Sequence, residues 1–144
     1  MRTLADSNVL VAGLLRGHPH HGRAAPVLRG ARSGERALVV ASHALAEAYA
    51  TLTALPVSPR VTPAEAARMI DDDVASVAEV VALDGADYVA VLDRMARLDL
   101  PSGAVYDALH VRAAEKAGAD ELLTFNGAHF RRMPPEPPCR LVVL

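Results

Sequence analysis

The chain has 144 residues, of which 51% are hydrophobic and 22% are charged, and its formal net charge is −2. This length predicts one domain, residues 1–144, with a sizeable core. No apolar run approaches the ~20 residues of a membrane-spanning helix. The chain as a whole also lacks the basic excess of a non-specific nucleic-acid binder. We therefore expect no membrane contact, and any contact with nucleic acid must be local.

The apolar pattern predicts short apolar strands separated by helices. In chain order we expect a strand at 2–5, helices at 7–15 and 23–32, a strand at 36–41, helices at 42–55 and 63–74, a strand at 77–83, helices at 85–98 and 104–118, and strands at 121–125 and 140–144. Four residues are expected to cap helices, namely Ser42, Thr62, Asp84 and Ser102. Continuous apolar strands that alternate with helices indicate a three-layer α/β fold around a central, mostly parallel sheet.

The N-terminus does not resemble a signal peptide, because Asp6 lies where an apolar core would continue. We therefore expect a cytoplasmic protein. Cys139 is the only cysteine, which excludes an internal disulfide and a thiolate metal cluster. Lys116 is the only lysine among 15 basic residues, and the arginines suit bidentate contacts with phosphate.

Four polar residues are expected at the carboxyl edge of the sheet, where ligands of such folds bind: Asp6, Glu47, Asp107 and Asn126. Asp6 and Asn126 follow strands, and Glu47 lies about one turn into the helix after the second strand. Each also has a structural interpretation. Asp6 and Asn126 would cap helices, Glu47 would be solvated, and Asp107 would pair with a distant arginine.

Asp107 is the most informative of these acids, because apolar residues surround it in the sequence. It needs a partner, yet the nearest arginine, Arg112, projects from a different face of the helix. Clustered carboxylates repel one another unless a cation neutralises them. Oxygen ligands select hard divalent ions, so the pattern predicts a site for Mg²⁺ or Mn²⁺.

The chain resembles the PIN-domain family, and within it the VapC-like toxins, over essentially its whole length. Four motifs in order carry the resemblance: Asp6-Ser7-Asn8-Val9-Leu10, Glu47, Tyr106-Asp107-Ala108, and Leu123-Thr124-Phe125-Asn126 followed by His129-Phe130. The resemblance implies a Rossmann-like PIN fold, Mg²⁺- or Mn²⁺-dependent endoribonuclease activity, a homodimer and inhibition by a small VapB-like antitoxin. It also implies that Asp6, Glu47 and Asp107 form the acidic triad of the family.

One position departs from the family pattern, because Asn126 stands where the family has a fourth acid. We interpret Asn126 as a polar group that orients metal-bound water, and the number of metal ions, one or two, stays open. Asp120 is an alternative source of charge, but its place before a strand points to the opposite edge of the sheet. The expected antitoxin groove runs along residues 7–15 and 39–55, which flank the cleft.

The mechanism expected from these residues is hydrolysis of an RNA phosphodiester by metal-activated water. Asp6 and Asp107 would hold the ion most directly, while Glu47 would complete its shell or accept a proton from water. Two other functions remain open. An aspartyl-phosphate phosphatase would need an acid at Asn8 and a lysine for the phosphate. A catalytically silent PIN-fold binding module would tolerate Asn126.

Other charged residues have simpler interpretations. His18, His20 and His21 fall in a loop rich in helix breakers and are expected to be solvated rather than metal ligands. The remaining histidines are expected to pack in the core or to support a site without acting as bases: His43, His110 and His129. The run Asp71-Asp72-Asp73 is expected to be a solvated helix end. Four arginines form either a basic rim for RNA or surface salt bridges: Arg23, Arg29, Arg32 and Arg36.

Overall fold

A five-stranded parallel sheet forms the middle layer of the computed structural model, which describes residues 1–144. The strands are β1 (Arg2–Ala5), β2 (Ala37–Ala41), β3 (Glu79–Val81), β4 (Glu121–Thr124) and β5 (Arg140–Val143). Their order across the sheet is β3-β2-β1-β4-β5, and every neighbouring pair is parallel. The predicted α/β fold around a parallel sheet is confirmed.

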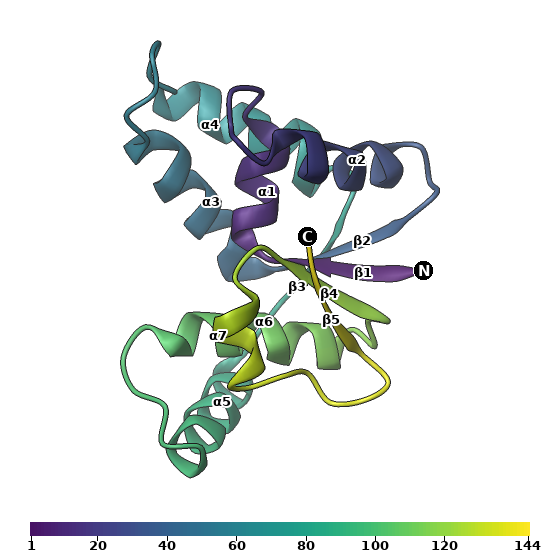
Figure 1. Ribbon diagram of the computed structural model, residues 1–144, viewed down its shortest axis with the longest axis vertical. Coiled ribbons are helices and arrows are strands. Elements are labelled where there is room, and N and C mark those ends of the chain that lie inside the picture. The colour runs from purple at the N-terminus through teal and green to yellow at the C-terminus, as the bar shows by residue number, and fades with distance from the viewer.

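Helices cover both faces of this sheet (Figure 1). One layer contains α1 (Ser7–Leu14), α2 (His21–Arg32), α3 (Ser42–Ala54) and α4 (Pro63–Ile70). The other contains α5 (Gly85–Arg97), α6 (Ala104–Lys116) and the short α7 (Gly127–Arg131). Parallel strands require such crossovers, because each strand must start again at the same edge of the sheet.

The core lies where the helical layers meet the sheet. Leu4, Val39, Val40 and Leu122 of the three central strands are fully buried, as expected for strands covered on both faces. On one side, α1 and α2 approach closely at Gly13, where an added Cβ would lie only 2.8 Å from Leu28 Cδ1. A larger residue at this point would have to displace the Leu28 side chain.

Two of the four predicted helix caps are confirmed. The Thr62 side chain accepts a hydrogen bond from the backbone N–H of Glu65, whose carboxylate accepts from the N–H of Thr62. Asp84 and Asp87 form the same reciprocal pair at the start of α5. Each capping box satisfies backbone donors that the first helical turn leaves free.

The other two predicted caps are wrong. β2 runs directly into α3, so Ala41 takes the N-cap position, Ser42 is already helical, and no side chain caps this helix. Ser102 lies one residue before the N-cap of α6, in the left-handed region with φ 58°, and makes no capping bond. In both places the path of the backbone, rather than the serine, determines where the helix begins.

Several element boundaries also differ from the prediction, most clearly at three elements. The helix expected to reach residue 74 ends at Ile70 and continues as one π-helical turn, η1 (Asp71–Ala75), where Arg32 of α2 pairs with Asp73. α2 begins at His21 rather than residue 23, so the loop before it is shorter than expected. β3 is shorter than the predicted strand 77–83, because only Glu79–Val81 pair with β2.

No helix is both long enough and apolar enough to cross a membrane.

Candidate active site

A cavity of about 500 Å³ opens at the carboxyl edge of the sheet. Its lining includes all four residues that the sequence placed at this edge: Asp6, Glu47, Asp107 and Asn126. They come from the end of β1, from α3, from the first turn of α6 and from the loop after β4. Asp120 lies before β4, where its carboxylate accepts a hydrogen bond from the backbone N–H of Arg2. It is therefore at the opposite edge, as expected.

Asp6 is buried at the centre of the site, with 4% of its surface exposed. Its Oδ2 accepts a hydrogen bond of 2.8 Å from the Thr124 hydroxyl, and its Oδ1 accepts one of 3.3 Å from Ser7 Oγ. Asp6 holds the N-cap position of α1, but its side chain makes no capping bond. Asn126 holds the same position at α7, also without a side-chain capping bond. The structural interpretation as caps therefore fails for both residues.

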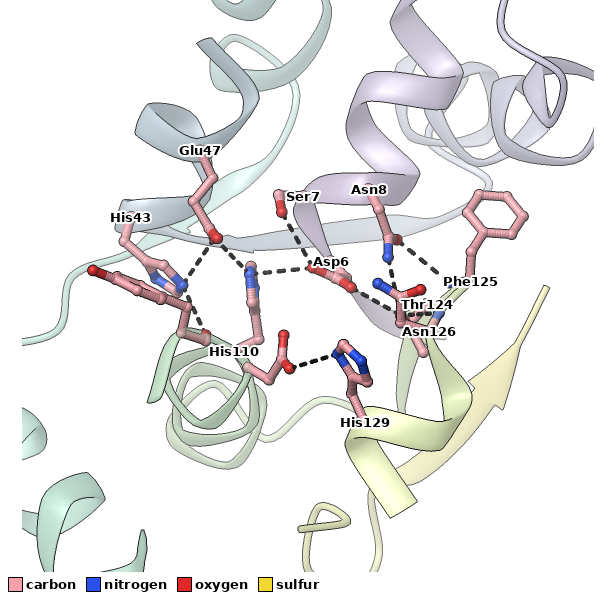
Figure 2. Close-up of polar contacts among 12 residues, drawn as sticks. Asp6, Ser7, Asn8, His43, Glu47, His110, Thr124, Phe125, Asn126 and His129 are labelled. Carbon is pink, nitrogen blue, oxygen red and sulfur yellow. Dashed lines mark hydrogen bonds and ion pairs between the residues drawn. The ribbon is translucent and has the colours of Figure 1, made fainter. Parts of the chain in front are cut away.

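Glu47 is held by two histidines on one side of the cavity (Figure 2). Its Oε1 lies 2.9 Å from His110 Nε2 and 3.2 Å from His43 Nε2. Burial opposes ionisation, but the hydrogen bonds and charges of these imidazoles outweigh it and lower the pKa of Glu47 to about 2. Glu47 is therefore an ionised carboxylate with a fixed orientation.

His110 links Glu47 to Asp6. Its side chain is 1% exposed, and its Nε2 also lies 3.2 Å from Asp6 Oδ1. Burial disfavours the imidazolium, yet the contact with Glu47 and the charges of Asp6 and Asp107 prevail and raise the pKa of His110. The Nδ1 atoms of His110 and His43 are buried and have no hydrogen-bond partner. The polar contacts of the His110 ring are therefore all made through Nε2, to the two acids.

Asp107 lies near Asp6 and has no lysine or arginine partner. Burial first, and then the nearby Asp6 carboxylate, raise the pKa of Asp107, although His129 Nδ1 lies 3.2 Å from its Oδ2. No lysine or arginine forms an ion pair with Asp6 or Asp107, and Arg132 only lines the cavity. Arg112 reaches Asp87 instead, at 2.9 Å, as its different helix face predicted. The acids of the cavity therefore have histidines as their only ion-pair partners.

This donor set fits a divalent cation. The carboxylates of Asp6 and Asp107 and the amide of Asn126 offer hard oxygen ligands to the same cavity, which suits Mg²⁺ or Mn²⁺. Glu47 belongs to a second group with His43 and His110, in which one donor atom from each residue lies within 4.8 Å of the others. A cation would also oppose the burial and the Asp6 charge that together raise the pKa of Asp107.

Sequence reasoning placed the acids but missed the contacts made by the histidines. His43 and Glu47 are four residues apart on α3, and Asp107 and His110 are three apart on α6, so each pair shares a helix face. This spacing was the available signal. The role of Thr124 was also missed. Its hydroxyl donates to Asp6 and accepts a hydrogen bond of 2.9 Å from the backbone N–H of Asn126.

The four arginines that the sequence offered as a basic rim lie in different regions. Arg36 does not belong to a basic rim, because its guanidinium bonds Glu121 and Thr3 at the amino end of the strands. Arg29 and Arg32 line a cavity of about 260 Å³ between α1 and α2. Arg23 lies over the Phe125 ring beside the candidate active site.

Three comparisons place this chain and its fold among known proteins. The model of the PIN domain family matches residues 3–134. Ribonuclease VapC40 of Mycobacterium tuberculosis is 36% identical over 119 residues, which are 83% of this chain and 82% of the relative. The crystal structure of VapC20 of Mycobacterium tuberculosis, a toxin that cleaves the sarcin-ricin loop, superposes with a TM-score of 0.69 at 18% identity, covering 91% of this chain and 95% of that one. VapBC2 from Rickettsia felis, bound to a DNA fragment from its promoter, gives a TM-score of 0.67 at 17% identity, over 100% of this chain and 99% of that one. The chain therefore belongs to the PIN domain family, and within it to the VapC-like proteins.

Proposed function

We propose that this protein, as a single domain of residues 1–144, is a Mg²⁺- or Mn²⁺-dependent endoribonuclease and the toxin of a VapBC-type toxin–antitoxin pair. The observation that carries the proposal is the pair of carboxylates, Asp6 and Asp107, that share one cavity without a lysine or arginine partner. A divalent cation held by these two residues would supply the missing positive charge. The 36% sequence identity to ribonuclease VapC40 over most of the chain supports RNA as the substrate.

Asp6 and Asp107 would hold the ion most directly, and Glu47 would complete the site from the other side of His110. Bound Mg²⁺ makes water a better nucleophile and neutralises charge that builds on the phosphate oxygens. Without the ion, the three acids would repel the phosphate of the substrate.

The chain's own residues would hold the carboxylates in place and orient the attacking water. Glu47 is ionised, because its pKa is lowered to about 2, which suits a charged group that completes the site better than a base that accepts a proton from water. His110 positions both Glu47 and Asp6 through Nε2. Asn126 would orient the water through its amide, which bonds no other protein group. Thr124 keeps Asp6 fixed between the two strands by its 2.8 Å bond.

We propose a homodimer and a small VapB-like antitoxin as partners. The antitoxin groove would run along residues 7–15 and 39–55, which include α1, the end of β2 and all of α3. The antitoxin would inhibit the enzyme by placing a basic or polar side chain in the acidic cavity. Similarity of the fold to VapBC2 of Rickettsia felis supports such a complex.

A cleavage assay tests the nuclease proposal. Purified wild type, Asp107→Asn and Asn126→Ala are compared on single-stranded RNA with Mg²⁺ and with chelator. We expect cleavage by the wild type only with metal and none by Asp107→Asn, because this substitution removes a charged ligand. Asn126→Ala should be about 10–100-fold slower, as is typical of residues that support a metal ligand. Chelator-resistant cleavage, or an Asp107→Asn protein as active as wild type, would contradict the proposal.

A further inference from the structure

A second cavity, of about 330 Å³, adjoins the acidic one. Its lining consists of Ser7, Asn8, Val11, His18, His20, Thr51, Leu55, Phe125 and Asn126. Three of these residues, Ser7, Asn8 and Asn126, also line the acidic cavity. The two cavities are therefore neighbours that share a wall at the ends of β1 and β4. A ligand whose reacting group lies at Asp6 and Asp107 would extend its next group into the second cavity.

Stacked rings form one wall of this second cavity. The His20 ring stacks on Phe125, with 4.6 Å between ring centroids and an interplanar angle of 19°. Arg23 fixes the arrangement, since its guanidinium bonds His20 Nδ1 at 2.7 Å and lies 5.2 Å from the centroid of Phe125. Figure 2 shows the Phe125 ring beside the Asn8 side chain, on the side of Asp6 away from Glu47. This wall combines aromatic faces with a positive charge.

Two amides supply polar groups between the cavities. Asn8 accepts one hydrogen bond of 3.3 Å from the N–H of Phe125 and donates one of 3.4 Å to Thr124 Oγ1. Its amide therefore retains a second N–H and a second lone pair. The Asn126 side chain is exposed and makes no hydrogen bond with the protein. Both amides can donate and accept at the same time, as the edge of a nucleobase requires.

We propose that this second cavity binds one unpaired nucleobase of the RNA, next to the phosphate that is cleaved. The inference rests on the proposed ribonuclease function and adds a determinant of sequence preference to it. Proteins recognise single-stranded RNA by stacking splayed bases on aromatic or arginine planes and by bonding the base edges. His20 and Phe125 supply the stacking surface, Asn8 and Asn126 read the edge, and Arg23 contacts the adjoining phosphate.

The loop that carries His18 and His20 also brings positive charge toward the path of the RNA backbone. Arg16 from this loop lines the cavity between α1 and α2 together with Arg29, and neither arginine forms an ion pair. The chain as a whole has a net charge of −2, so this basic surface is local. Arg23, which lies over the Phe125 ring and forms no ion pair, favours an anionic, aromatic ligand at the stacked rings. The antitoxin groove proposed above shares residues with this cavity, so the antitoxin and the RNA would compete for it.

The test measures binding separately from cleavage. Asp107→Asn protein, which leaves RNA intact, is titrated in a fluorescence anisotropy assay with a single-stranded oligonucleotide and with a series in which each member lacks one base. We expect that removal of one particular base weakens binding roughly 10-fold, the order found for stacking on an aromatic side chain. Removal of bases elsewhere should have a smaller effect.

Substitutions in the cavity then show where that base binds. His20→Ala and Phe125→Leu, each added to Asp107→Asn, should weaken binding of the intact oligonucleotide and abolish the penalty for the missing base. The two losses should not add, because they remove the same contact. Arg23→Gln should weaken binding to every oligonucleotide, because it removes the phosphate contact, and should also reduce the penalty for the missing base, because Arg23 holds the His20 ring. Arg60→Gln, at an exposed arginine away from both cavities, is the matched control and should change nothing.

Three outcomes would overturn the inference: no RNA binding, no penalty for any missing base, or a penalty that persists in both His20→Ala and Phe125→Leu. The last outcome places the base elsewhere, and the first two leave an antitoxin segment as the better occupant. Wild-type cleavage with Mg²⁺ is measured on the same oligonucleotide. If the wild type cleaves the RNA but no missing base weakens binding, only the proposed base site is contradicted. If a missing base weakens binding but the wild type does not cleave, only the proposed nuclease function is contradicted.

Discussion

Two aspartates, Asp87 and Asp6, are almost equally buried, at 3% and 4% exposed, but they have opposite surroundings. Asp87 Oδ2 lies 2.6 Å from the ammonium of Lys116, and its Oδ1 lies 2.9 Å from the guanidinium of Arg112. It also accepts the backbone N–H of Asp84. The hydrogen bond from Lys116 is the largest cause that holds the pKa of Asp87 well below its usual range. Every charge at this site has a partner.

Asp6 has no lysine or arginine partner; its contacts are the hydroxyls of Thr124 and Ser7 and the imidazole of His110. Its acidic neighbour Asp107 lies on α6, the same helix that supplies Arg112 and Lys116 to Asp87. Burial and the Asp6 charge raise the pKa of Asp107. Helix α6 thus directs the only lysine of the chain to Asp87 of α5, whereas its own Asp107 lies near the acid Asp6. The difference indicates which carboxylates stabilise the fold and which are available to a cation.

The largest effect on stability is expected at Asp87. Asp87→Asn removes the charge that pairs with Lys116 and Arg112 and weakens the capping box of α5, so the Tm should fall on the order of 5 °C. Cleavage per folded molecule should be unchanged. Differential scanning calorimetry and the RNA assay measure the two quantities. Asp93→Asn is the control, because its 3.5 Å pair with Arg97 is exposed and should contribute almost nothing. An Asp87→Asn protein with wild-type Tm would break the comparison.

A smaller change in stability, of opposite sign to that of Asp87→Asn, is expected for Asp107→Asn when a chelator removes metal ions, and it should depend on pH. Asp87 has a lowered pKa, so its contribution is present above the unfolded-state pKa of about 3.9 and is lost as the pH falls below it. Asp107 has a raised pKa, so its charge destabilises the fold at neutral pH, and this penalty disappears as the pH falls through the folded-state pKa. Without metal, Asp107→Asn should therefore be more stable than wild type near neutral pH.

Urea unfolding from pH 7 down to about pH 3 measures both differences. The stability advantage of Asp107→Asn over wild type should shrink toward zero on acidification. The advantage of wild type over Asp87→Asn should shrink as well, but only below about pH 4. Asp93→Asn should follow wild type throughout. If Asp107→Asn were less stable than wild type at neutral pH without metal, the acids at the cavity would not be repelling one another.

Sequence reasoning recovered the order of elements because burial on two faces produces continuous apolar strands. It was wrong about residues that are apolar and packed against the core but form no hydrogen bonds to a neighbouring strand. Val77, Ala78 and Leu83 pack against the core without pairing with β2, so the strand predicted over 77–83 is reduced to its central three residues. It failed again at Ser42, because a strand that leads directly into a helix leaves no room for a capping side chain.

The candidate site was predictable to the extent that strand ends determine it. Asp6 and Asn126 follow parallel neighbouring strands, so their common edge follows from the topology. The contact between Glu47 and His110 was not predictable, because these residues are 63 positions apart and meet only when α3 and α6 are placed on the sheet. The aromatic stack of His20 and Phe125 joins segments that are still further apart in the chain. Contacts of this kind depend on packing angles that a local pattern does not contain.

Calorimetric titration of Mn²⁺ into the purified protein tests the central claim most directly. We expect Mn²⁺ to bind wild type and Asp87→Asn with similar affinity and to raise their Tm, because a ligand of the folded state stabilises it by mass action. Asp6→Asn and Asp107→Asn should bind at least about 10-fold more weakly, since each loses a charged ligand. Failure of wild type to bind Mn²⁺, or equal binding by Asp6→Asn, would contradict the assignment of these acids to a metal site.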